Sequence, residues 1–95
     1  MKTVFYAGQE LIVTDELAEV LLAAAMELSD DDRTYRVPVA CRLGGVAHMA
    51  QLLLGPGIPL LVVDAPDDVE PAAGSESSAA FIVELTESLA ADDED

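Results

Sequence analysis

The sequence predicts an α+β fold, a two-layer sandwich in which helices cover one face of a mostly antiparallel sheet. Stretches of alternating apolar and polar residues flank two turn-forming pairs, Gly8-Gln9 and Gly44-Gly45. Two Ala- and Leu-rich stretches repeat apolar residues at helical spacing. Together these patterns give the order β-β-α-β-β-β-α for a single domain, residues 1–91, followed by a disordered acidic tail, residues 92–95.

The first strand, residues 2–7, is expected to turn at Gly8-Gln9 and return through residues 10–13. The opposed pairs are then Phe5 with Ile12 on one face and Val4 with Val13 on the other.

Thr14 is suited to cap a helix, because its hydroxyl can accept a free N–H of the first turn. Asp15 and Glu16 follow at the positive end of the helix dipole. The helix should end near Ser29, before the solvated loop of Asp30, Asp31 and Asp32. Its apolar stripe comprises Leu17, Val20, Leu21, Ala24, Ala25 and Leu28.

Residues 34–43 and 46–54 read as a second hairpin around Gly44-Gly45. Pro38 cannot donate to a ladder, so we expect an edge strand or a bulge there. The alternative for residues 46–54 is a short helix, because their side chains also tolerate one. In the hairpin, the opposed pairs on the inward face are Cys41 with His48, Val39 with Ala50 and Val37 with Leu52.

The apolar run at residues 58–63 is expected to form a buried strand. A loop rich in Pro and acids, residues 64–75, leads to a last helix capped by Ser77 or Ser78. Residues 80–85 also suit a strand, because Phe-Ile-Val favours one. In the helix, Glu84 and Glu87 face water, and the apolar stripe comprises Phe81, Ile82, Leu85 and Leu89.

The charge is strongly asymmetric. The net charge is −15, and no Lys or Arg follows Arg42. This arrangement argues against nucleic acid or an anionic membrane as a direct ligand, because both require clustered cations. It is compatible with a basic protein partner. The apolar stretches are too short or too interrupted to span a bilayer, and the single cysteine indicates a reducing, cytoplasmic location.

Catalytic and metal-binding patterns are weak. Cys41 and His48 would face each other as a nucleophile and its base, but both read more simply as core residues. The acidic runs lack the ligand order of an EF-hand, and the glycine pairs lack the spacing of a phosphate-binding loop. We therefore expect no enzyme activity, no cofactor and no metal. A carboxylate pair assembled from distant residues is the alternative that sequence leaves open.

The residues that we single out for interaction are the exposed arginines and the acidic loop. Arg36 and Arg42 share the sheet face opposite Val37 and Cys41. Their simplest role is to neutralise nearby acids. The acidic loop contributes Asp67, Asp68 and Glu70.

The stretch Leu52-Leu53-Leu54-Gly55-Pro56-Gly57-Ile58-Pro59-Leu60, with the hairpin and capped helix before it, resembles a group of short acidic actinobacterial proteins. The resemblance spans residues 4–63. It implies a bacterial, cytoplasmic origin and a fold, and it implies no activity and no site residues.

The function expected from these features is a small, non-catalytic protein-interaction module. Its partner is a protein, in one version a basic one, and in another version a second copy of the chain that joins through a sheet edge. The alternative is a DNA mimic or antitoxin-like inhibitor, whose carboxylates occupy the cationic site of a nucleic-acid-binding protein.

Overall fold

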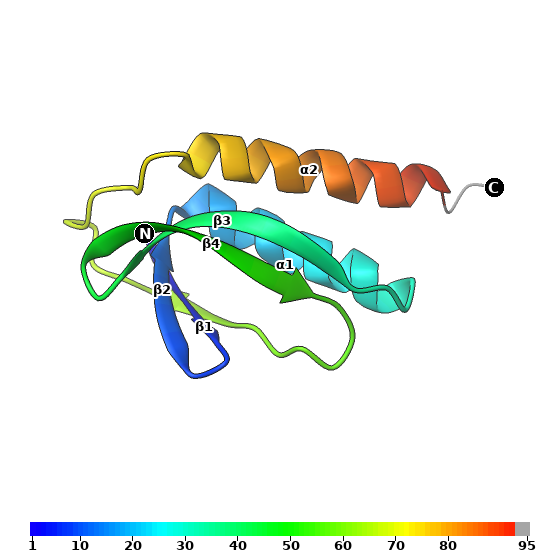
Figure 1. Cartoon of the computed structure of the whole chain (residues 1–95), viewed down its shortest axis with the longest axis horizontal. Coiled ribbons are helices and arrows are strands. Elements are labelled where there is room, and N and C mark those ends of the chain that lie inside the picture. The colour runs from blue at the N-terminus through cyan, green and yellow to red at the C-terminus, as the bar shows by residue number, and fades with distance from the viewer. Residues whose placement is uncertain (93–95) are drawn as a thin grey trace.

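The computed structural model describes residues 1–92, which fold as an α+β domain with a five-stranded antiparallel sheet and two helices (Figure 1). The strands lie in the order β4-β3-β2-β1-β5, so β4 and β5 form the two edges. The predicted order of elements is confirmed. The elements are β1 (Lys2–Tyr6), β2 (Gln9–Val13), α1 (Asp15–Asp30), β3 (Tyr35–Leu43), β4 (Val46–Leu54), β5 (Leu61–Asp64) and α2 (Ser75–Asp92).

The first hairpin turns one residue earlier than predicted. Tyr6 pairs with Gln9, so the turn consists of Ala7 and Gly8, both with positive φ (49° and 83°). Positive φ at both central residues is the geometry that matches the twist of a hairpin, and Ala rarely adopts it. The predicted direct partners were therefore wrong, since Val4 lies opposite Leu11. The pairing register between the two strands is shifted by two residues. Because side chains alternate between the faces with a period of two, each side chain stays on its predicted face.

The second hairpin matches the prediction. Cys41 pairs with His48 and Val37 with Leu52, around Gly44-Gly45, and residues 46–54 are a strand and not the alternative helix. His48 shares the face of Cys41 as predicted, but the expectation that it is a core residue was wrong, because its side chain is exposed. The buried part of this hairpin reaches only as far as Cys41, so the end that carries the turn projects beyond the core.

β3 lies inside the sheet, yet only one of its residues, Arg42, pairs with β2, through Ile12. Beyond this bridge the β3–β4 hairpin leaves the other strands and crosses the β1–β2 hairpin steeply (Figure 1). The side of β3 that faces away from β4 is therefore free of strands at Pro38. A missing N–H costs nothing there, which explains how the proline fits an interior strand.

β5 differs from the predicted buried strand. It begins at Leu61 and pairs only with β1, as an edge strand. Leu61 is 57% exposed and Val63 is 41% exposed. An apolar run predicts burial on both faces, but within residues 1–92 the face that carries Leu61 and Val63 is left exposed.

The helices pack against each other and against the inner face of the sheet. Thr14 caps α1 as predicted, and its Oγ1 accepts the Leu17 N–H at 3.2 Å. In α1 the predicted stripe is confirmed, since Leu17, Leu21, Ala24 and Leu28 are buried and Val20 and Ala25 are half-buried. The fully buried core residues from the helices and strands include Val4, Val13, Leu17, Leu21, Leu28, Val37, Val39, Leu54 and Ile82.

α2 begins at Ser75, earlier than the predicted caps at Ser77 or Ser78, and residues 80–85 are helical. Phe81 is 45% exposed, so its predicted place in the buried stripe was wrong. The helix runs along β3 (Figure 1) and includes Asp92, the first residue of the expected tail; residues 93–95 lie outside the described part. Neither α1 nor the described part of α2 is long and apolar enough to cross a membrane.

Ser78 fixes α2 to the free side of β3. Its Oγ accepts the Ala40 N–H at 3.1 Å, and both residues are buried. The helix thereby satisfies a backbone donor that the missing neighbouring strand would otherwise leave unpaired. The free side of β3 is thus occupied by α2 at Ala40, whereas the outer edge of β4 has no such cover from the backbone of another element within residues 1–92.

Candidate interaction surfaces

The β3–β4 hairpin and the segment that follows it are free of acids. All 19 acids lie in residues 10–32 and 64–95, whereas residues 33–63 contain none and carry Arg33, Arg36 and Arg42. The net charge of −15 is therefore concentrated on the helices, the loops beside them and the terminal regions. The β3–β4 hairpin is the part of the molecule that an acidic macromolecule can approach with least repulsion.

The outer edge of β4 presents a row of unpaired backbone groups. The two-residue turn makes Leu43 and Val46 the first hydrogen-bonded pair, and such pairs recur at every second residue. The N–H and C=O groups of the intervening residues, Ala47, Met49 and Gln51, consequently point away from β3. None of these groups has a hydrogen-bond partner within residues 1–92.

The side chains of this edge are apolar and exposed. Val46 is 59% exposed, Met49 is 52% exposed and Leu53 is 49% exposed. β4 has no Lys, Arg, Asp, Glu or Pro, the residues that usually prevent an edge strand from pairing with another chain. At nine residues it is also long for an edge. β4 therefore has the properties of a strand that pairs with a partner.

Tyr6 limits how far this open row extends. Its hydroxyl donates to the Leu53 carbonyl at 2.9 Å and accepts the Leu53 N–H at 3.1 Å. Both outward backbone groups of Leu53 are thus occupied from within the molecule. The part of the edge that can accept another strand is confined to Ala47 through Gln51.

The opposite edge, β5, is better protected. It has only four residues, and Asp64 lies at its end. The Ala65 N–H donates to the Met1 carbonyl at 3.1 Å, so Met1 and Ala65 are a hydrogen-bonded pair of the β1–β5 ladder. Because such pairs recur at every second residue, only Val62 and Asp64 of β5 have backbone groups that point away from β1. Shortness and a charge both discourage strand addition, so β5 is the weaker candidate despite its exposed Leu61.

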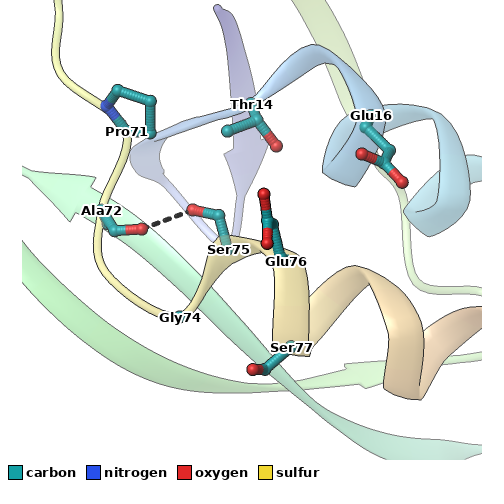
Figure 2. Close-up of a pocket in the computed structure, with 8 residues that line it drawn as sticks. All are labelled: Thr14, Glu16, Pro71, Ala72, Gly74, Ser75, Glu76 and Ser77. Atoms are coloured by element: carbon teal, nitrogen blue, oxygen red, sulfur yellow. Dashed lines mark hydrogen bonds between the residues drawn. The ribbon is translucent and has the colours of Figure 1, made fainter.

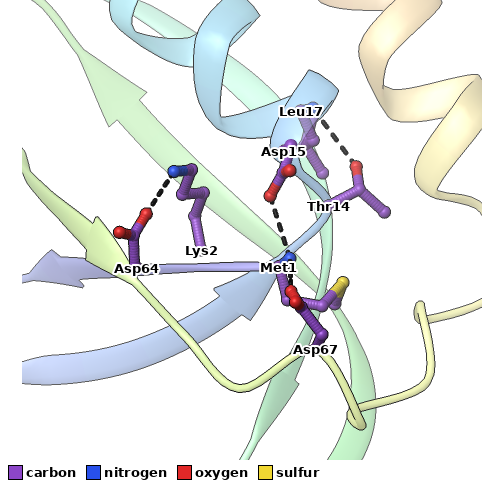
Figure 3. Close-up of polar contacts among 7 residues, drawn as sticks. All are labelled: Met1, Lys2, Thr14, Asp15, Leu17, Asp64 and Asp67. Atoms are coloured by element: carbon purple, nitrogen blue, oxygen red, sulfur yellow. Dashed lines mark hydrogen bonds and ion pairs between the residues drawn. The ribbon is translucent and has the colours of Figure 1, made fainter.

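Ion pairs gather where β1, β5 and α1 meet (Figure 3). The Met1 ammonium lies 2.9 Å from Asp15 and 3.6 Å from Asp67, and Lys2 is hydrogen-bonded to Asp64. These hydrogen bonds lower the pKa of Asp15 and of Asp64 below their ordinary values and raise the pKa of Lys2. All of these contacts are internal, so this cluster joins the strands to α1 and offers little to a ligand.

The structure places the five predicted interaction residues in different settings. Arg42 Nε donates to the Glu70 carbonyl at 2.6 Å, and one of its terminal nitrogens lies 3.9 Å from the Glu70 carboxylate. Arg42 and Glu70 thus form an exposed ion pair within the molecule. Asp67 contacts the terminal ammonium. Asp68 and Arg36 are exposed, and Arg36 pairs across the ladder with Leu53 of β4.

Cys41 and His48 are direct neighbours across the hairpin, but they do not form a nucleophile and base. No hydrogen bond joins them, since the Cys41 thiol is buried and His48 is exposed at the solvent side. Burial raises the pKa of the thiol, although a hydrogen bond with the Ala50 backbone opposes this effect. A reactive cysteine requires the opposite shift.

A cleft of about 440 Å³ lies between the amino-terminal ends of the helices, where Thr14, Glu16, Ser75 and Glu76 line it (Figure 2). Both capping residues are engaged. The Ser75 hydroxyl donates to the Ala72 carbonyl at 2.6 Å, and the Thr14 hydroxyl caps α1. The lining has two carboxylates from distant parts of the sequence, Glu16 and Glu76, and no Lys, Arg or His side chain.

Among residues 1–92, no three His, Cys, Asp or Glu side chains come together as a metal-binding group. Comparison with protein families, with curated proteins and with solved structures finds no match to the chain. The resemblance to short actinobacterial proteins stays a prediction. The residues that sequence reasoning missed are Ala47, Met49 and Gln51; the absence of acids from residues 33–63 marked the region but not these positions.

Proposed function

We propose that this protein is a small, non-catalytic interaction module that binds an extended segment of a partner protein as an additional strand beside β4. The observation that carries the proposal is the unprotected outer edge of β4, where three successive outward-facing residues have unpaired backbone groups. Main-chain hydrogen bonds provide affinity in such complexes, and side chains at alternate positions provide specificity.

The side chains around the edge indicate which segments fit. Val46, Met49 and Leu53 offer apolar contact, and no acid lies on β3 or β4. Arg36, one strand further in, is exposed. An apolar or mildly acidic segment is therefore favoured here. A basic partner would instead be attracted to the acidic helices.

The proposal includes a cytoplasmic location, which the single cysteine supports because it leaves no internal disulfide to form. Cys41 is buried and packs as a core residue, a role that needs no oxidising environment.

Selection of peptides provides the test. Random nine-residue peptides displayed on phage are selected on the immobilised protein, and the enriched peptides are measured against two variants. Met49→Lys places a charge in the middle of the open edge, and Leu61→Lys makes the same change at an equally exposed position of β5.

We expect the enriched peptides to alternate apolar residues and to bind the wild-type protein and Leu61→Lys, and to lose binding to Met49→Lys. Failure to enrich any peptide, or binding that Met49→Lys leaves unchanged, contradicts the proposal. Enrichment of basic peptides that bind both variants and dissociate with salt would favour the inhibitor of a nucleic-acid-binding protein instead.

A further inference from the structure

We infer that the partner strand is β4 of a second copy of this chain, and that two copies form a symmetric dimer with a continuous antiparallel sheet centred on Met49. The inference rests on the proposed strand addition at β4 and names its occupant.

Charge restricts how two copies can meet. Each copy has a net charge of −15, and all of its acids lie outside residues 33–63. Contact through the helices or through β5 would bring carboxylates together, whereas β3 and β4 carry none, so contact through β4 opposes fewer of them. The edge is thus the approach at which self-association meets the least repulsion. The arginines of β3 make the same edge unfavourable for a basic partner.

The positions of the open backbone groups determine the register. A two-fold axis beside Met49 places Met49 opposite its own copy, Ala47 opposite Gln51 and Gln51 opposite Ala47. Every outward group of these three residues then has a partner. An axis beside Ala50 would place Ala47 opposite Leu53, whose outward groups are already bonded to the Tyr6 hydroxyl. An axis beside His48 would place Gln51 opposite the turn residue Gly45.

The Met49-centred arrangement also matches the exposed apolar surface. The axis places the two Met49 residues directly opposite each other on one face. Each Met49 side chain is 52% exposed in the single chain, and its Sδ accepts a hydrogen bond from the Ser78 Oγ of α2 at 3.7 Å. The interface is small, since it consists mainly of one strand from each copy. Association is therefore expected to be reversible and dependent on concentration.

Sedimentation equilibrium over a range of concentrations tests the inference, with wild type, Met49→Lys and Leu61→Lys at low and at high salt. We expect a monomer–dimer equilibrium that salt strengthens, because screening reduces the repulsion between two acidic molecules. Met49→Lys should raise the dissociation constant of the dimer by at least about tenfold, because it places two lysine ammonium groups opposite each other at the axis. Leu61→Lys should dimerise like the wild type. Circular dichroism checks that both variants are folded.

Disulfide trapping tests the register. Under mild oxidation Met49→Cys should form a covalent dimer, because directly opposed strand residues lie within the Cα separation that a disulfide spans. Ala47→Cys, which is also at an exposed position but faces Gln51, should not. Equal trapping of both variants, or trapping of neither, overturns the register.

A chain that stays monomeric in all conditions, or a dimer that Met49→Lys leaves intact, overturns the inference. If such a monomer still binds selected peptides through Met49, strand addition stands and the occupant is another protein. If neither dimer nor peptide binding depends on Met49, the proposed function fails as well.

Discussion

The Tyr6 hydroxyl forms two hydrogen bonds with the backbone of Leu53, as donor to its carbonyl and as acceptor from its N–H. The contact joins β1 to the outer edge of β4, two strands that are not neighbours in the sheet. It holds the β3–β4 hairpin over the first hairpin, and it ends the open row of backbone groups after Gln51.

Removal of this hydroxyl should loosen the edge. Tyr6→Phe is expected to lower the free energy of unfolding by about 1 kcal/mol, because the contact is exposed and water replaces the lost bonds. Tyr35→Phe is the control, since Tyr35 is 44% exposed and forms no such bond. Denaturant unfolding measures both changes. Equal effects of the two substitutions would show that the Tyr6 hydroxyl does not restrain β4.

The bond between Ser78 and Ala40 should be worth more, because both residues are buried. Ser78→Ala leaves the Ala40 N–H without a partner, and we expect a loss of about 1–3 kcal/mol in unfolding free energy. Ser77→Ala, one residue earlier and exposed, should change it by less than about 0.5 kcal/mol. If Ser78→Ala leaves the unfolding free energy unchanged, water satisfies the Ala40 N–H in the variant, and the hydrogen bond from α2 is not needed to cover this side of β3.

The Cys41 thiol should react slowly with a colourimetric disulfide reagent in the folded protein. It is fully buried, and its raised pKa keeps the thiolate scarce at neutral pH. In denaturant the reaction should become as fast as that of an ordinary free thiol. Rapid reaction of the native protein would contradict this prediction and would favour the interpretation of Cys41 as a nucleophile with His48 as its base.

The Lys2–Asp64 pair predicts how stability depends on pH. The hydrogen bond with Lys2 lowers the pKa of Asp64 from 3.8, so the contribution of Asp64 is present above this pH and is lost as the pH falls through the lower folded value. The same bond raises the pKa of Lys2 from 10.5, so the contribution of Lys2 is present below this pH and is lost as the pH rises through the higher folded value.

Unfolding of wild type and Asp64→Asn across this range checks the prediction. The difference in unfolding free energy between the two proteins should be constant at intermediate pH and should shrink toward both extremes. High salt should reduce it throughout, because the pair is exposed. A difference that grows at low pH would mean that the carboxylate destabilises the fold.

Most of the fold could be predicted from local signals. Gly44-Gly45 fixed the register of the second hairpin, because two residues that readily adopt positive φ mark a two-residue turn. The first turn was misplaced because Ala7 takes a positive φ without any sequence signal. Leu61 and Val63 were expected to be buried, since an apolar run does not show which strand ends up at the edge.

The candidate site was harder to predict, because it consists of backbone groups left open by the strand order. Nothing in the residues 47–51 distinguishes an edge strand from a central one. Arg42 and Glu70 stood out in the sequence because they are charged, yet in the structure they neutralise each other. Met49 looked like an ordinary apolar residue of a hairpin, and only the sheet order shows that its backbone is unpaired.

Residue-resolved amide hydrogen exchange at low and at high protein concentration tests the central claim most directly. The account predicts that the amides of Ala47, Met49 and Gln51 exchange rapidly in dilute solution and become protected as concentration rises, while those of Val62 and Asp64 on β5 stay unprotected. Protection that appears on β5, or β4 amides that exchange equally fast at every concentration, would contradict strand pairing between copies at this edge.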